Sequence, residues 1–480
     1  MQLLIFNKYM FQRFAISLLM FWLIAFALVG ANAHTYVVVG FSAILMPYVI
    51  KNSVIVVSFF VYFLAFGSIV GTENNLFGII GVNEVTQIGM IIFIYEGKYK
   101  KKCSSKIIET VKKLLLVLLV YGIIYTAKSV LVTQPLIIGL STQHHTDFYI
   151  FKTTFKLLLN YIPLIYIINR IEHIDILKAV NMAILLSVIT IGITLPFSGF
   201  LDNFGFYMSS LETDMSLSGV SIDRIKGFYG AGGDVNSAGV FFAIAFGYFL
   251  SWAEKTKTIN KILLTGLILS FLGIFFSASR TAMLSLGSVV ILFFCFNWNM
   301  LLKPKKGKIV FLLFTVFMFS APIILNALDR FWLDSAYSAI DPNSTGRIGK
   351  WLIYFEYFKR CPESFIFGYV TPIYKEIAYN FLSLVPHNVF INIAYNAGLF
   401  LLFPFIYLLV KICIWGWHEQ KNVRILYAVV PYFFALMSVN SPGSGIFLWL
   451  MIPVYAATIN SQYRVSSQAA KYRPKTVLSK

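Results

Sequence analysis

The stretch FAISLLMFWLIAFALVG, from Phe14 to Gly30, decides which kind of fold this chain can adopt. It holds no charged residue, and its length approaches the ~20 apolar residues that a helix needs to cross about 30 Å of hydrocarbon. Lys8 and Arg13 precede it, as basic residues do on the cytoplasmic side of a membrane helix. The run is long for the apolar part of a signal peptide, so we expect an uncleaved membrane helix.

Stretches of this kind recur through the 480 residues. The chain is 58% hydrophobic and only 12% charged, whereas a soluble domain carries about 25% charged residues. Windows of ~20 apolar residues predict about fourteen spans, and therefore an all-α polytopic integral membrane protein. The expected spans are centred on Trp22, Ala43, Tyr62, Met90, Leu119, Pro163, Val188, Ala245, Leu269, Val289, Val316, Tyr395, Phe433 and Leu450.

The net charge of +19 is distributed as membrane topology requires. Lysine clusters within residues 98–106, 255–261 and 303–308 lie in short loops between apolar stretches. Loops rich in lysine and arginine stay on the cytoplasmic side of a membrane. We therefore expect a multi-pass protein of the bacterial inner membrane with both termini in the cytoplasm, whose basic residues face lipid headgroups rather than nucleic acid.

This topology divides the chain into three parts. Residues 1–197 form an N-terminal bundle, and residues 414–480 form the last spans and a basic cytoplasmic tail. Between them, residues 198–413 form a core with external loops at 198–235 and 328–387, and another external segment begins near Lys128. After Gly346, apolar residues recur at helical spacing and predict a short amphipathic helix on the membrane surface: Ile348, Trp351, Leu352, Phe355 and Phe358.

Polar motifs follow one another through this core. Arg224-Ile-Lys226-Gly-Phe leads to Asp234-Val-Asn236-Ser-Ala, and then to the turn Ser279-Arg280. Next come Thr345-Gly-Arg347-Ile-Gly-Lys-Trp351, Pro386-His387-Asn388-Val-Phe390 and Asn396-Ala-Gly398-Leu. In this order the motifs resemble the O-antigen ligase and polymerase superfamily, which includes Wzy-type polymerases and WaaL-type ligases. Gly227-Phe228 departs from the family pattern because no residue separates the pair.

The resemblance implies a multi-span glycosyltransferase of GT-C-like architecture that works on the periplasmic face. It implies an oligosaccharide linked to undecaprenyl diphosphate as donor, with the lipid diphosphate as leaving group. It implies no cofactor, no nucleotide sugar and no metal ion, and a separate chain-length regulator as partner. The first external loop, residues 31–36, holds no acidic residue, which also argues against a metal-dependent enzyme of this type.

The residue types in the motifs suit that reaction. Negative charge grows on the diphosphate as the glycosidic bond breaks, and guanidinium groups bind phosphate oxygens through paired hydrogen bonds. We assign this catalytic role to Arg280 and Arg347. His387 is the expected base for the proton of the attacking sugar hydroxyl, since an ordinary imidazole titrates near neutral pH. The expected substrate-binding residues are Arg224, Lys226, Asn236 and Asn388.

Each assignment has a structural alternative. His387 could cap the helix that follows it or bind a backbone carbonyl. Arg280 could be an anchor that reaches from a span end to the interface. Arg347 could be a charge on a surface helix, and Arg224 a solvated charge in a loop.

Functions from two classes stay open. The first class is sugar transfer, either polymerisation of lipid-linked O-antigen repeat units or ligation of finished O-antigen to lipid A core. The motifs do not separate these two, and the number of spans and the long external loop favour the polymerase. The second class is transport of the lipid-linked oligosaccharide. A transporter favours charges within its spans and matching halves, whereas here the arginines gather at span ends and the halves do not match.

Overall fold

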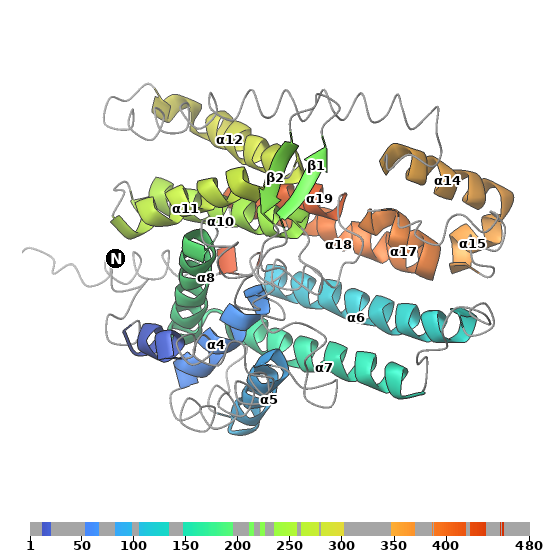
Figure 1. The fold of residues 1–480 in the computed structure, drawn as a ribbon, viewed down its shortest axis with the longest axis horizontal. Helices are drawn as coiled ribbons and strands as arrows, with labels where there is room; N and C mark the ends of the chain where they lie inside the picture. Colours follow the sequence, from blue (N-terminus) through green and yellow to red (C-terminus); the bar gives the residue numbers. More distant parts are fainter. Residues whose placement is uncertain are drawn as a thin grey trace, which may run out of the picture.

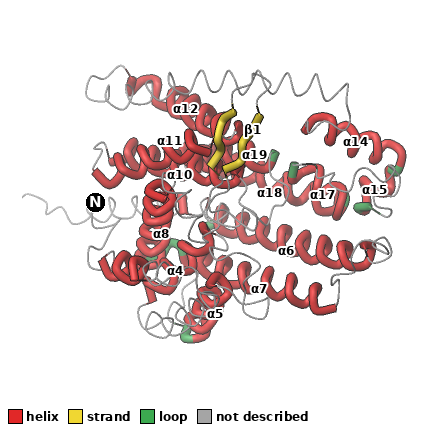
Figure 2. Tube along the Cα trace, viewed as in Figure 1, coloured by secondary structure: helices red, strands yellow, loops and turns green. Residues whose placement is uncertain are grey.

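The computed structural model describes the elements that carry most of the motifs (Figure 1). The described residues are 12–20, 53–66, 82–97, 105–133, 147–194, 211–215, 221–225, 235–256, 261–277, 280–301, 347–369, 386, 388–418, 423–437, 452 and 454–455. Helices dominate them (Figure 2), so the all-α expectation is confirmed for this part of the chain, apart from one antiparallel hairpin. None of the described helices has both the length and the apolar character that crossing a membrane requires.

The elements follow the three parts of the chain. The described helices of the first part are α4 (Ser53–Phe66), α5 (Val82–Tyr95), α6 (Lys106–Thr133), α7 (Asp147–Arg170) and α8 (Ile174–Thr194). The hairpin of β1 (Leu211–Met215) and β2 (Ser221–Ile225) lies in the loop 198–235. After it come α10 (Val235–Thr256), α11 (Lys261–Ser277), α12 (Arg280–Leu301), α14 (Arg347–Arg360), α15 (Pro362–Phe367), α17 (Val389–Ala397), α18 (Leu399–His418), the short helix η4 (Val423–Ile425) and α19 (Leu426–Leu436). Helix α18 thus continues past residue 413, the predicted boundary between the core and the last part of the chain.

The helices pack as two neighbouring groups. In the first group α4 lies against α5 and α8, and α7 lies against α5 and α6. In the second group α10 lies against α11, α12 and α19. Helix α8 joins the groups by contacting α10 and α11, while α6 packs along α18 and reaches α17. The first part of the chain therefore contacts the helices that carry the motifs.

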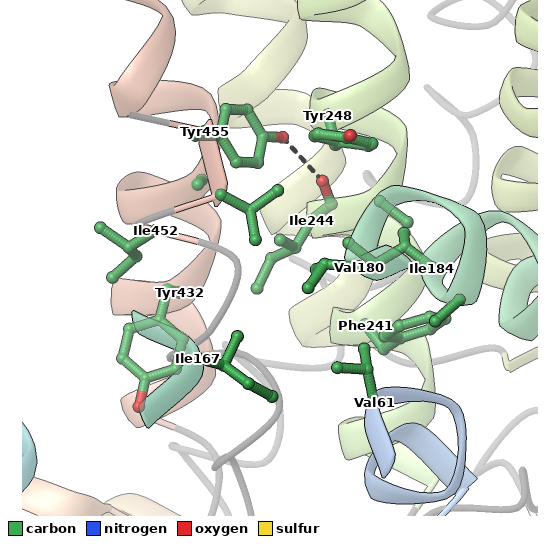
Figure 3. Close-up of a cluster of buried hydrophobic side chains, with 14 of the residues drawn as sticks. Val61, Ile167, Val180, Ile184, Phe241, Ile244, Tyr248, Tyr432, Ile452 and Tyr455 are labelled. Carbon is green, nitrogen blue, oxygen red and sulfur yellow. Dashed lines mark hydrogen bonds between the residues drawn. The ribbon is translucent and has the colours of Figure 1, made fainter. Parts of the chain in front are cut away.

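Apolar and aromatic side chains fill the centre of the bundle (Figure 3). The Tyr455 hydroxyl donates a hydrogen bond of 2.9 Å to the backbone carbonyl of Ile244, which satisfies a buried hydroxyl that burial would otherwise penalise. Gly247, which follows on the same helix, allows α10 and α19 to approach closely. A Cβ at Gly247 would lie only 2.6 Å from the carbonyl oxygen of Tyr427.

The single span expected around Tyr395 is wrong, because the structure has two helices there. Helix α17 ends at Ala397 and α18 begins at Leu399, with Gly398 between them at φ +71°. This left-handed conformation is strained for any residue that carries a Cβ. A Cβ at Gly398 would also meet the carbonyl oxygen of Ile366 at 2.2 Å. Hydropathy cannot detect such a break, because both flanking segments are apolar.

The other expected span centres fall into two sets. Those that lie in described helices are Tyr62, Met90, Leu119, Pro163, Val188, Ala245, Leu269, Val289 and Phe433. Those that lie outside the described residues are Trp22, Ala43, Val316 and Leu450.

The helix predicted after Gly346 is confirmed as α14. In its predicted apolar stripe, Leu352 and Phe355 are 56% and 54% exposed, whereas Phe358 is buried. Tyr354 and Tyr357 are buried beside Phe358. These rings pack against α15 and α17, so tertiary contacts rather than hydropathy choose the inward face.

Candidate functional site

Asn388 caps the helix that follows the His-Asn motif. Its backbone is extended, and its Oδ1 accepts hydrogen bonds from the backbone N–H groups of Phe390 at 2.9 Å and Ile391 at 3.2 Å. The side chain is buried. This is the geometry expected of an asparagine N-cap, so Oδ1 serves the helix and contact with a substrate would fall to Nδ2. His387 lies outside the described residues, while its neighbours Pro386 and Asn388 lie within them.

Trp351 connects the Arg-x-x-x-Trp motif to the His-Asn motif. Its indole Nε1 donates a hydrogen bond of 2.7 Å to the carbonyl oxygen of Pro386, which lies 35 residues further along the chain. Arg347 is the first residue of α14, one helical turn before Trp351. Residues four apart share a helix face, so the backbone of Arg347 starts the face that meets the His-Asn segment.

Arg280 is connected to the same segment through α19. It is the first residue of α12. On that helix, Ser285 Oγ donates to the carbonyl oxygen of Thr281 at 2.7 Å and lies 3.3 Å from the carbonyl oxygen of Pro431. On α19, the ring of Phe433 lies 5.6 Å from the ring of Phe390, the second residue after Asn388. The start of α12 therefore reaches the start of α17 through two contacts.

Two of the other predicted binding residues lie on described elements. Arg224 is in β2, which contacts α11, and it stands opposite Glu212 of β1 in the strand register (Figure 1). Directly opposite residues of an antiparallel pair are close neighbours, so the register gives Arg224 an acidic neighbour. Asn236 is the second residue of α10. Lys226 lies outside the described residues.

The structure also assembles a group of tyrosines that the motif analysis missed. Tyr395 of α17 stacks on Tyr369 with ring centroids 4.7 Å apart and meets the ring of Tyr354 edge-on at 5.1 Å. Tyr121 stacks on Tyr125 in α6, and its hydroxyl accepts a hydrogen bond of 3.4 Å from Asn396, the neighbour of Tyr395. We call this group the tyrosine cluster: Tyr121, Tyr125, Tyr354, Tyr369 and Tyr395.

Lys128 brings a cation to the tyrosine cluster. Its Nζ donates a hydrogen bond of 3.1 Å to the carbonyl oxygen of Tyr369 and lies 4.6 Å from the centre of the Tyr369 ring. Burial lowers the pKa of the Lys128 ammonium, because the charged form loses hydration. The contact joins residues 241 positions apart, so no local spacing in the sequence could have revealed it.

Within the described part of the chain, no cluster of His, Cys, Asp and Glu side chains could hold a metal ion. Comparison of the chain with protein-family models, with curated proteins and with solved structures gives no match. The arrangement therefore has to be interpreted from its own chemistry. Helix α14, which begins with Arg347, contacts the His-Asn segment through Trp351, and α12, which begins with Arg280, is linked to it through α19.

Proposed function

We propose that this protein is a membrane-embedded glycosyltransferase that polymerises undecaprenyl-diphosphate-linked O-antigen repeat units on the periplasmic face of the bacterial inner membrane. The hydrogen bond between Trp351 and Pro386 carries the proposal. It joins the motif assigned to charge stabilisation with the motif assigned to proton transfer. The contacts through Pro431 and Phe433 link α12, which begins with Arg280, to the same segment and support the proposal.

The contacts at the two ends of α6 support the sidedness that this proposal needs. Near the start of α6, Lys106 lies over the ring of Trp415 at 4.6 Å, and both residues belong to regions expected in or next to the cytoplasm. At the other end, Lys128 bonds to Tyr369, and both belong to segments expected outside. The lysine clusters of the sequence and these two tertiary contacts thus favour the same orientation of the chain in the membrane.

In the proposed reaction, a hydroxyl oxygen of the acceptor sugar attacks the anomeric carbon of the donor. The bond from that carbon to the diphosphate oxygen breaks, and the leaving diphosphate keeps the electron pair. His387 accepts the hydroxyl proton, and Arg280 and Arg347 stabilise the charge that grows on the diphosphate. Direct displacement inverts the configuration at the anomeric carbon.

Complementation of a deletion strain tests the assignment. Arg280→Ala, Arg347→Ala and His387→Ala proteins should reach the membrane yet fail to restore long O-antigen chains, as seen by gel electrophoresis of the lipopolysaccharide. Arg360→Ala is the matched control, because Arg360 lies on α14 like Arg347 but forms an exposed ion pair with Glu356. It should restore the full ladder. A full ladder from all three test variants would remove the catalytic assignment.

The same gel separates polymerase from ligase. A strain that lacks the polymerase should carry core with a single repeat unit. A strain that lacks the ligase should carry bare core and accumulate polymer on the lipid carrier. The first pattern is the one we expect for this chain.

A further inference from the structure

Lys128 is a half-buried cation whose hydrogen bond and ring contact both go to Tyr369. Among the acidic side chains that the structure describes, none lies within ion-pair distance of it, whereas the exposed Lys113 of the same helix pairs with Glu109 at 3.3 Å. Removing a charge from water is costly unless it is paired, so the position of Lys128 favours an anion that arrives from outside the chain.

The groups around Lys128 are donors of the kind that bind anions and sugar hydroxyls. Burial, with a further contribution from Tyr125, raises the pKa of Tyr354, so its phenol stays protonated. Asn396 already donates through Nδ2 to the Tyr121 hydroxyl at 3.4 Å and to the side chain of Asn392 at 2.5 Å. Tyr125 is 48% exposed, so the cluster is accessible from one side.

We infer that Lys128 and the tyrosine cluster form a second anion-binding site, which takes a phosphate or carboxylate group of a glycan substrate. An ammonium has more donors than the single bond to Tyr369 uses, and the neighbouring phenols add hydroxyl donors and ring faces. The inference that this site binds an anion depends on these contacts alone. The inference that the anion belongs to a glycan rests on the proposed function.

The distance along α17 separates this anion from the leaving group. Asn396, beside Lys128, and Asn388, at the His-Asn motif, are the two ends of a helical segment roughly 12 Å long. In this proposal the group held by Lys128 is a second anion, either the diphosphate of the acceptor's own lipid carrier or an acidic sugar in the glycan.

Binding of small anions to the purified protein in lipid nanodiscs tests the site directly. We would use protein that carries Arg280→Ala and Arg347→Ala, which removes the cations proposed for the leaving group, and measure inorganic pyrophosphate and glucuronate by calorimetry. Lys128→Met should weaken binding about tenfold or more, as expected for a charged hydrogen bond, and Lys128→Arg should retain it. Lys113→Met is the control and should bind as its parent does.

Each outcome has a defined meaning. Pyrophosphate binding that depends on Lys128 indicates the phosphate of a lipid carrier, and glucuronate binding that depends on Lys128 indicates an acidic sugar. Binding of neither probe, or equal binding by the Lys128→Met protein, overturns the site. If the Lys128→Met protein does not fold, Tyr125→Phe provides the same test, because it removes one half-exposed hydroxyl and should weaken binding about threefold. Unchanged affinity in that variant also overturns the site.

Transfer assays keep this inference distinct from the proposed function. If wild-type protein elongates lipid-linked repeats, Lys128→Met should raise KM for that substrate while kcat stays close to wild type. A fall in kcat by the same factor as the rise in KM would indicate a structural role for Lys128 and overturn the inference. If wild-type protein elongates nothing but binds pyrophosphate through Lys128, the proposed function fails and the anion site stands.

Discussion

At the scale of the single residue, two side chains hold the backbone on either side of His387. Asn388 accepts hydrogen bonds from the first N–H groups of α17, and Trp351 donates its indole N–H to Pro386. All of the partner atoms belong to the main chain. The polar atoms of these motif residues therefore restrict the path of the chain, and the proposed chemistry falls to the imidazole and guanidinium groups.

The N-cap gives the first prediction at this scale. Asn388→Ala should lower the free energy of unfolding by about 1 kcal/mol, because two backbone donors at the start of α17 lose their acceptor. Asn388→Asp should retain most of the stability, since a carboxylate also caps a helix and suits its N-terminal dipole. Thermal unfolding of the purified proteins in detergent measures the difference. Equal losses of stability in both variants would show that Asn388 does not stabilise the protein by capping α17.

The indole hydrogen bond gives a second prediction. Trp351→Phe keeps an aromatic ring but leaves the buried Pro386 carbonyl without its donor, which should cost roughly 1–3 kcal/mol of stability. If the bond also positions the His-Asn segment, kcat for sugar transfer should fall more than KM changes. Phe355→Leu, an exposed position on the same helix, should change neither quantity. A Trp351→Phe protein with wild-type kcat would refute the positioning role.

At the scale of the element, the junction of α17 and α18 depends on one glycine. Gly398 has a left-handed backbone, and its N–H donates to the Ala394 carbonyl at 2.9 Å, which ends α17. The same position faces the backbone of Ile366 at the end of α15. The junction thus holds α15 against α17 and fixes where the motif helix stops.

Substitution at this junction should therefore be severe. Gly398→Ala places a Cβ 2.2 Å from the Ile366 carbonyl oxygen and forces an alanine into a left-handed conformation, so we expect a loss of about 2 kcal/mol or more. Gly122→Ala in α6 is the matched control. Its Cβ would meet only the flexible end of Leu157, and alanine favours a helix, so stability should change little. Comparable losses of stability in the two variants would show that the backbone conformation of Gly398 is not the cause of the loss.

The elements also show which features sequence patterns can predict. Helical spacing predicts α14, because periodicity is a local property, and apolar windows locate the helices around Leu119, Ala245 and Val289. The break at Gly398 escapes such windows, since hydropathy carries no information on backbone angles. The contact of Lys128 with Tyr369 escapes them as well, because it depends on how α6 packs against distant helices.

At the scale of the whole molecule, the proposed topology assigns the two ends of α6 to opposite sides of the membrane. Lys106 contacts Trp415 near its start, and Lys128 contacts Tyr369 near its end. The motif helices α14, α15 and α17 gather at the Lys128 end (Figure 1). If the chain crosses the inner membrane as proposed, everything at the Lys128 end faces the periplasm, and everything at the Lys106 end faces the cytoplasm.

Cysteine labelling in intact cells tests this orientation. In a protein whose cysteines at 103, 295, 361 and 413 are all changed to serine, Glu363→Cys adds an exposed thiol at the start of α15, and Glu109→Cys adds one near the start of α6. A membrane-impermeant maleimide should label the first thiol through the porous outer membrane, and the second only after the inner membrane is permeabilised. Labelling of both thiols from the same side would contradict the proposed topology. If that side is the cytoplasm, α14, α15 and the His-Asn motif would face the compartment that lacks the lipid-linked glycan.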